Sequence, residues 1–303
     1  MKVTPIIPLT GAMVTSTTAP EPGTGEVAWV SGTTYTTGQE VIRTQTHKVY
    51  VRRTDGAGTT APELDLVNWR EDRPTNAWAM FTAERNQQTE VAGPLTVVIS
   101  PGRRINTLAL VGLDVDSYDI TMESGGATVF ERLNQNMILR NSRTATEYCF
   151  GGFRYKPSAI HFDLPPFANA TITVTLRSAR PTLKCGGLHI GNSHAIGQVE
   201  YGAQSSQLTF SEVVRDSFGN ARLRKVGTLP KTQQSLFFEK ALTPKLLQLR
   251  RDTDSVPAIW SGLDDRTDSS YFEALLIVGI YRLWDLDLSN FTHGKATLQL
   301  EEI

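Results

Sequence analysis

The sequence is short of cysteine and of long apolar runs. Cys149 and Cys185 are the only cysteines among 303 residues, and the N-terminus lacks the pattern of a secretion signal. Two thiols in this context are expected to be reduced and partly buried rather than joined in a disulfide or bound to zinc. The longest apolar run, Ala274 to Tyr281, is far below the roughly 20 residues that span a bilayer. The sequence therefore predicts neither a disulfide framework nor a membrane span.

The chain also lacks an excess of charge of either sign. Its 30 Lys and Arg residues stand against 31 Asp and Glu residues, which gives a formal net charge of -1. No overall field draws such a protein to nucleic acid or to an anionic membrane. Of the 30 basic residues 21 are arginine, and guanidinium groups are enriched at protein interfaces. The arginine pairs are scattered, which favours protein over nucleic acid as the partner: Arg52-Arg53, Arg103-Arg104 and Arg250-Arg251.

Signatures of catalysis and cofactor binding are missing as well. The sequence has no G-x-S-x-G nucleophile elbow, no G-x-x-x-x-G-K-[ST] phosphate loop and no G-x-G-x-x-G after a strand. Among the 5 histidines only His189 and His194 are close, and their spacing fits neither a helical nor a strand metal pair. We therefore expect no cofactor and no metal.

Carboxylates are the remaining candidates for chemistry. Asp114 and Asp116 would lie on the same side of one strand, and Asp264, Asp265 and Asp268 share one loop. Either set could supply the acid and base of a glycosidase or the oxygen ligands of calcium. Solvated carboxylates at strand ends and in loops are far commoner. We therefore predict that the protein is not an enzyme.

What the sequence does contain is typical of a β-protein, with abundant threonine, 24 glycines and 15 prolines. Residues 1–25 hold Pro5, Pro8, Pro20 and Pro22, which predicts an extended arm that docks on a neighbouring subunit. Residues 26–70 have the large aromatics of a small compact unit, residues 71–182 predict a β-sandwich, and residues 183–303 predict an α+β domain. The predicted fold class is mainly β.

Four large aromatics are spaced along residues 26–70 and are expected to build the core of so short a unit. They read Trp29-x5-Tyr35-x2-Gly38-x2-Val41, then Val49-Tyr50, then Pro62 and Trp69. This order resembles the small three-stranded chitin-binding type of carbohydrate-binding module. The resemblance implies a three-stranded fold, and in that family exposed aromatics stack on sugar.

The resemblance breaks where the family places its sugar-stacking pair, because Tyr50 is followed here by Val51-Arg52-Arg53-Thr54. We therefore favour a scaffold unit that keeps its aromatic core and uses arginines against a protein neighbour. Glycan binding through remaining aromatics is the alternative. The candidate contacts to a glycan or to another subunit are Trp29, Tyr35, Tyr50, Trp69, Arg52 and Arg53.

Alternating apolar and polar residues predict antiparallel strands across residues 71–182, with turns at Pro101-Gly102, Gly125-Gly126 and Pro165-Pro166. We interpret them as a jelly-roll-like sandwich. Beyond residue 183, Asp216 to Asn220 is a hairpin loop, and Thr243 is the N-cap of a helix with Pro244 at its first position. Residues 233–242 fit either a strand or a helix, and further strands are predicted near residues 257–260, 272–282 and 296–300.

A second resemblance rests on the segment in front of the sandwich, Arg73-Pro74-Thr75-Asn76-Ala77-Trp78-Ala79-Met80-Phe81. In tail and baseplate proteins of bacteriophages an aromatic module leads through Pro-Thr-Asn-x-Trp-Ala-Met-Phe into a sandwich, and this chain resembles that arrangement over residues 26 to about 125.

This second resemblance implies a structural component of a phage tail, baseplate or fibre. Such a subunit would be made in the host cytoplasm and would reside in the virion as a homo-oligomer among other tail proteins. A receptor- or glycan-binding tail component is the alternative, and a hydrolase of cell wall or glycan is a third class.

Overall fold

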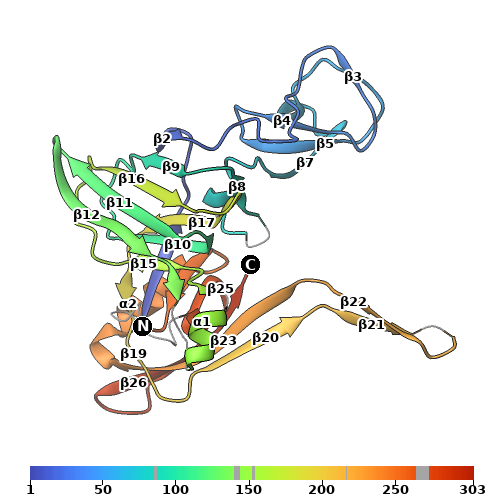
Figure 1. Ribbon diagram of the computed structural model, residues 1–303. Coiled ribbons are helices and arrows are strands. Elements are labelled where there is room, and N and C mark those ends of the chain that lie inside the picture. The colour runs from blue at the N-terminus through green and yellow to red at the C-terminus, as the bar shows by residue number, and fades with distance from the viewer. Residues whose placement is uncertain (85–86, 140–143, 152–153, 216, 264–272) are drawn as a thin grey trace. The chain divides into compact units, whose positions relative to one another are not determined.

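The computed structural model describes residues 1–84, 87–139, 144–151, 154–215, 217–263 and 273–303. The chain is mainly β, as predicted (Figure 1). It divides into two compact units. The larger unit contains residues 8–190, and the smaller unit joins residues 1–7 to residues 191–303. Among the described residues, no helix is both long and apolar enough to cross a membrane.

The larger unit begins with the aromatic module. Its three-stranded antiparallel sheet has the order β4 (Glu40–Arg43), β5 (Lys48–Arg52) and β7 (Trp69–Pro74). A second pair is formed by β3 (Thr33–Tyr35) and β6 (Gly56–Gly58), and a 3-10 turn, η1 (Pro62–Leu64), precedes β7. The strands are short because polar turns separate them. The module therefore depends on its aromatic rings for a core.

A five-stranded antiparallel sheet follows the module. Its order is β12 (Ala127–Asn136), β11 (Ser117–Ser124), β16 (Thr171–Arg177), β9 (Leu95–Ile99) and β2 (Val14–Thr17). Alternate residues of β11, β16 and β9 are buried, which is the period of two that the sequence predicts. The buried side chains include Ile120, Val174 and Val97. One face of this sheet therefore forms part of the core.

The second sheet of the larger unit contains β15 (Ala159–His161), β10 (Thr107–Asp114), β17 (Leu183–Gly191) and β8 (Thr89–Val91). β10 and β17 come unusually close, since a Cβ on Gly112 would lie 3.0 Å from the Cα of Gly186, and Gly112 has a φ of +61°. Both features require glycine. Smaller elements complete the unit: η2 (Ala79–Phe81), β13 (Ile138–Leu139), α1 (Ala145–Phe150) and β14 (Arg154–Tyr155). The two sheets give a sandwich-like architecture (Figure 1).

The smaller unit is built on one antiparallel sheet. Its path runs through β1 (Lys2–Ile7), β24 (Ala258–Ser261), β25 (Leu276–Asp287), β26 (His293–Glu302), β23 (Thr228–Glu239) and β19 (Gln198–Val199). β18 (His194–Ala195) pairs with β1, and β20 (Gln204–Thr209) pairs with the start of β23. β21 (Glu212–Arg215) and β22 (Ala221–Arg224) form the hairpin predicted around residues 216–220. The short turns η3 (Lys240–Leu242) and η4 (Glu273–Leu275) connect the longer elements.

The helix predicted after residue 243 is present as α2 (Thr243–Asp252). Thr243 is its first residue rather than its N-cap, because η3 leads directly into the helix and the Thr243 hydroxyl donates to the carbonyl oxygen of Lys240 at 2.7 Å. Leu246 and Leu249 of α2 belong to the same buried cluster as Trp260 and Trp284. The helix thus helps to close the apolar core of the smaller unit.

The structure corrects the expected arm at residues 1–25. β1 lies inside the sheet of the smaller unit, where Val3 pairs with Trp260 on one side and with His194 on the other. Val3 and Thr4 are completely buried. Local proline content suggested an extended arm, but the pairing partners are more than 180 residues away in sequence and could not be read locally. The change between units lies after Ile190 rather than at residue 183.

The undecided stretch at residues 233–242 is mostly strand, because β23 continues to Glu239 before η3 begins. The acidic loop with Asp264, Asp265 and Asp268 lies outside the described residues. The N-terminal amino group of Met1 donates to the carbonyl oxygen of Gly197, which holds the start of the chain against β19. The first seven residues therefore serve the fold of the C-terminal unit.

A buried histidine makes the stability of the protein depend on pH. His189 in β17 is 2% exposed, its Nδ1 has no hydrogen-bond partner among the described residues, and burial lowers its pKa to about 4. The unfolded chain takes up this proton near pH 6.5, whereas the folded chain resists it. The free energy of unfolding should therefore be highest above pH 6.5 and fall by about 3 kcal/mol between pH 6.5 and pH 4.

Urea unfolding at a series of pH values measures this effect, and His189→Gln should flatten the part of the curve between pH 6.5 and pH 4. Cys185→Ala, at another completely buried position of β17, is the matched control: it leaves His189 in place and should keep the slope as it is. An unchanged slope in His189→Gln would contradict the assignment.

Candidate functional site

The aromatic module places three of its four candidate rings in its core. Tyr35, Tyr50 and Trp69 are each at most 2% exposed. The rings of Tyr35 and Trp69 meet edge to face with their centroids 5.1 Å apart. The Tyr35 hydroxyl also accepts from the amide of Val30 at 2.8 Å and donates to the carbonyl oxygen of the same residue at 3.0 Å. Sugar stacking needs an open ring face, and these three rings present none.

Trp29 packs at the edge of this core and is only partly buried. The guanidinium of Arg43 lies 4.8 Å from the centroid of its ring, and a two-pronged ion pair with Glu63 at 2.8 to 3.2 Å holds that guanidinium in place. The arginine lowers the pKa of the Glu63 carboxyl through this hydrogen bond. One face of Trp29 is therefore covered by a fixed cation.

The two candidate arginines point to different environments. Arg52 is 4% exposed, its Nε donates to the carbonyl oxygen of Thr54 at 2.6 Å, and its guanidinium lies 4.8 Å from the centroid of the Trp69 ring. Arg53 is exposed. Neighbouring residues at a strand end face opposite sides, so only one of the pair can reach solvent. The structure makes Arg52 part of the module's interior and leaves only Arg53 available to a neighbour.

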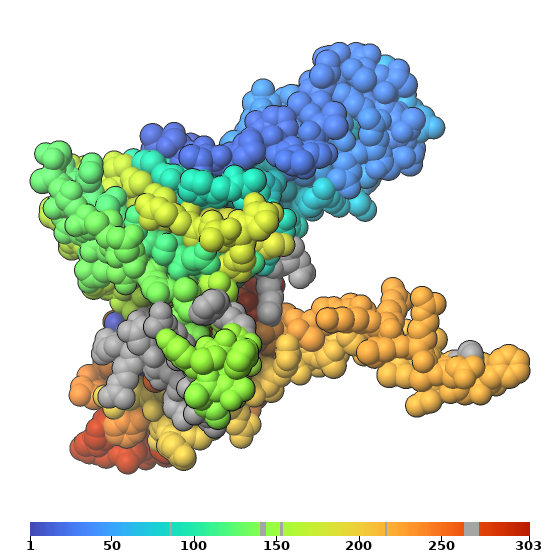
Figure 2. Space-filling view, viewed as in Figure 1, coloured from blue at the N-terminus to red at the C-terminus, as the bar shows by residue number. Residues whose placement is uncertain are grey.

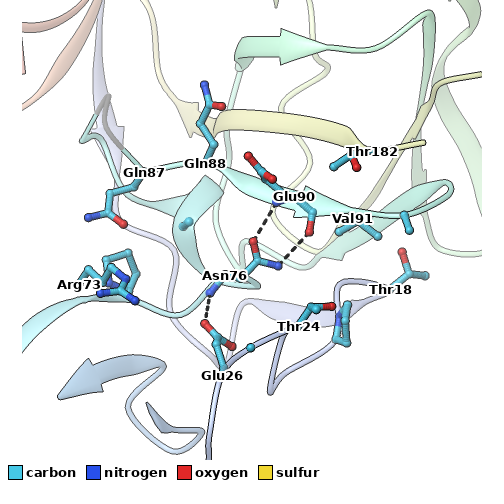
Figure 3. Close-up of a pocket in the computed structure, with 15 residues that line it drawn as sticks. Thr18, Thr24, Glu26, Arg73, Asn76, Gln87, Gln88, Glu90, Val91 and Thr182 are labelled. Carbon is cyan, nitrogen blue, oxygen red and sulfur yellow. Dashed lines mark hydrogen bonds between the residues drawn. The ribbon is translucent and has the colours of Figure 1, made fainter. Parts of the chain in front are cut away.

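The segment at residues 73–81 joins the module to the sandwich through several polar contacts (Figure 3). The side chain of Asn76 accepts from the amide of Glu90 at 2.9 Å and donates to the carbonyl oxygen of the same residue at 3.0 Å, like one more strand pairing with β8. The backbone amide of Asn76 donates to the carboxylate of Glu26 at 2.7 Å. Asn76 thus connects the start of the module, its end and β8.

The same segment is fixed on its other side by Glu21. The carboxylate of Glu21 accepts from the hydroxyl of Thr75 at 2.6 Å and lies 2.7 Å from Nδ1 of His47. The imidazole of His47 stacks on the ring of Trp78, with centroids 3.9 Å apart and planes 5° from parallel. Met80 is completely buried. Thr75, Asn76 and Trp78 of the Pro-Thr-Asn-x-Trp-Ala-Met-Phe segment therefore contribute directly to this junction.

A pocket of about 830 Å³ lies along the junction (Figure 3). It is lined by Thr18, Pro20, Thr24, Gly25, Glu26, Arg73, Pro74, Asn76, Ala79, Gln87, Gln88, Glu90, Val91, Ala92 and Thr182. The described lining contains no His, Cys, Ser or aromatic side chain, so it offers no ring on which a sugar could stack. Its central polar groups, on Glu26 and Asn76, already bond within the protein. Side chains that line the pocket therefore also hold the joint together.

Two of the carboxylates considered for catalysis, Asp114 and Asp116, are held by one arginine. Arg180 forms ion pairs with both Asp114 and Asp116, and Asp116 also accepts from the amide of Ala179 at 2.6 Å. The guanidinium lies 4.1 Å from the centroid of the Tyr155 ring. One guanidinium is thus shared by the two carboxylates and the Tyr155 ring, which is the geometry of an ion-pair cluster.

The cysteines do not lie together. Cys149 is exposed on α1 and Cys185 is buried in β17, where burial raises the pKa of its thiol to about 12. No group of three or more His, Cys, Asp or Glu side chains suited to a metal ion occurs among the residues that the structure describes.

An exposed apolar surface that the sequence did not indicate lies on the arm, a name used here for residues 204–229. It consists of β20, the hairpin β21–β22 and the first residues of β23, and almost all of its described residues are exposed (Figure 2). Seven of its large apolar side chains are 42% to 90% exposed: Leu208, Phe210, Val213, Val214, Phe218, Leu223 and Val226. Their alternation was visible in the sequence, but it gave no sign that neither face of the ribbon is covered.

Comparison with known proteins gives no family assignment. No protein-family model matches the chain, and no curated protein matches its sequence. Its function must therefore be argued from its own surfaces and contacts.

Asn76 should be required for a firm junction. Asn76→Ala removes two hydrogen bonds to Glu90, and we expect a loss of about 1 to 3 kcal/mol in the free energy of unfolding together with faster trypsin cleavage around residue 73. Urea unfolding and limited proteolysis measure the two effects. Asn169→Ala, on an exposed loop, is the control. Equal cleavage rates in both variants would show that the amide does not hold the joint.

The paired arginines of the module should differ sharply on substitution. Arg52→Met keeps an apolar stem but loses the bonds to the loop at residues 54–56, so we expect a loss of about 1 to 3 kcal/mol in the free energy of unfolding. Arg53→Met is the matched control and should change it by no more than about 0.5 kcal/mol. Denaturation followed by tryptophan fluorescence gives both values, and similar losses would contradict the inward placement of Arg52.

Proposed function

We infer that the protein is a structural component of a phage virion, in its tail, baseplate or an attached fibre, and that it acts by assembling with other subunits. The observation that carries this proposal is the arm. A two-stranded ribbon in water is marginally stable by itself, because it has no third strand and no packed face. An arm that exposes Phe210 and Leu223 at 55% and 68% is therefore suited to burial against another protein.

The aromatic module supports a scaffold role. Its buried rings form its core, and Arg43 covers one face of the partly exposed Trp29. The hydrogen bonds of Asn76 attach the module to the sandwich. A module with a packed core and a firm attachment is suited to act as a rigid spacer that fixes one subunit relative to the next. It is poorly suited to sugar stacking, which requires exposed rings.

The resemblance of residues 26 to about 125 to tail and baseplate proteins supports the same proposal, since the Pro-Thr-Asn-x-Trp-Ala-Met-Phe segment has a physical role as the joint between module and sandwich. We extend it to a jelly-roll-like topology for the sandwich and to a homo-oligomeric subunit. The near-zero net charge of -1 is compatible with surfaces that mostly face other proteins.

The test is whether the chain is built into particles and whether the arm is needed. Thr209 and Thr228 are directly opposite each other, so an Asn-Gly turn can replace residues 210–227 and close the ribbon at its foot. We expect antibody labelling and electron microscopy to find the full chain at the tail of purified phage. The shortened chain should fold but be at least about tenfold depleted from particles, the loss expected when a binding surface worth 1.4 kcal/mol or more is removed.

The control changes a different hairpin, with Asn-Gly in place of Gly125-Gly126 between β11 and β12. This variant should enter particles normally. Detection of the full chain only in lysate and never in particles would refute the proposed function.

A further inference from the structure

We propose that the arm of one copy docks on the outer face of the C-terminal sheet of a second copy, so that subunits associate head to tail. This inference rests on the proposed function as an assembly subunit, and it specifies the partner and both surfaces. The arm supplies the docking face. The receiving surface is the outer patch, defined as Phe237, Leu288, Phe291 and His293 with the acidic residues Glu239, Asp285 and Asp287.

The pairing register separates the two faces of the arm's hairpin. Val213 is directly opposite Leu223, so the two lie on one face, and Arg215 follows two residues later on that face. On the other face Glu212 is opposite Arg224, which places unlike charges together. The first face therefore combines an apolar centre, 57% and 68% exposed at its two residues, with a cation and no facing anion.

The outer patch has the complementary composition. Phe237 in β23 is 38% exposed and stacks on His293 of β26 with ring centroids 4.5 Å apart. Phe291 and Leu288 in the loop between β25 and β26 are 91% and 39% exposed. Aromatic side chains gathered on the solvent side of a sheet are typical of a binding surface.

Acidic residues surround this patch in the sheet register. Phe237 pairs with Lys295, which pairs with Asp287, so the three form one row across β23, β26 and β25. Glu239 lies in the next row on one side, and Asp285 in the next row on the other. All three carboxylates are exposed. The arm, by contrast, has four basic and two acidic residues between positions 204 and 229. Lys295 in the same row is paired with Glu200 at 2.8 Å, which leaves the three carboxylates in excess, so the charges of the two surfaces are complementary.

The arm cannot reach the patch of its own copy. β23 runs from Thr228, at the foot of the arm, to Phe237 in the patch, a distance of about 30 Å at about 3.3 Å per residue. The ribbon leaves the sheet at the start of β23, whereas Glu239 at its other end pairs with His293 next to the loop between β25 and β26 (Figure 1). Another copy must therefore supply the patch, and repetition of such a contact generates a ring or a filament.

Two charge-reversal variants test the contact in the full chain. Lys225 lies two residues after Leu223 and so follows it on the docking face. The arm variant, Arg215→Glu with Lys225→Glu, places acidic groups there. The sheet variant, Glu239→Lys with Asp285→Lys, places basic groups around the patch. Each variant alone then brings like charges together, and we expect its dissociation constant for self-association to rise by about tenfold or more relative to the unchanged chain. Sedimentation velocity over a range of concentrations measures this.

Mixing the two variants supplies the decisive result. The acidic arm meets the basic patch of the other variant, and the unchanged arm meets the unchanged patch, so the mixture should assemble although neither variant does so alone. Arg70→Glu with Arg103→Glu, which changes exposed arginines of the larger unit, is the matched control and should associate normally. Circular dichroism should give the same spectrum for all variants, since every changed side chain is exposed.

Three results would overturn the inference: an unchanged chain that stays monomeric, an arm variant that associates normally, or a mixture that fails to assemble. Any of these could occur with the chain still present at the phage tail, in which case the proposed function would stand and the arm would bind a different tail protein. Conversely, a chain that assembles as expected but never enters particles would refute the proposed function and leave the self-association in place.

Discussion

The alternation of side chains along β23 determines what the smaller unit presents to its surroundings. Leu236 and Phe238 must face inward to complete the core with Trp260 and Trp284, and the pleat of the strand then forces Phe237 to the opposite side. The first residues of β23, Thr228 and Leu229, belong to the arm and lie outside the core. One continuous strand thus fixes the core, the outer patch and the foot of the arm, and it keeps the two exposed surfaces apart.

The larger unit depends on a different kind of constraint. A module with a core of four rings buries too little surface to hold a fixed orientation by apolar contact, so its position must come from directional bonds. Asn76 supplies them, since an amide side chain can donate to and accept from one backbone residue, as a neighbouring strand would. Glu26 and Glu21 anchor the adjoining chain to the same short segment. Hydrogen bonds therefore fix the orientation of the module, a role that buried apolar area has in larger units.

Sequence patterns predicted correctly those elements that are formed by residues close together in the chain. The period of two in β11 and β16, the hairpin loop after Arg215 and the Thr-Pro start of α2 all follow from neighbouring residues. Long-range pairing was not accessible in this way. β1 finds its partners in residues far along the chain, and nothing near Arg52 indicates that it faces inward while Arg53 faces outward. The exposure of the arm is likewise a property of the fold.

The exposed arm also explains why assembly and local order should be coupled. A ribbon with no third strand gains little from its own contacts, so its stability in the free chain lies at the low end of the range found within one protein. Docking would supply the missing packed face and order the ribbon at the moment of contact, which lowers the affinity of each single contact. A weak contact that is repeated around a closed ring becomes strong collectively, because the last contact is intramolecular. Such a subunit would stay dispersed until enough neighbours are present, as the proposed role in assembly requires.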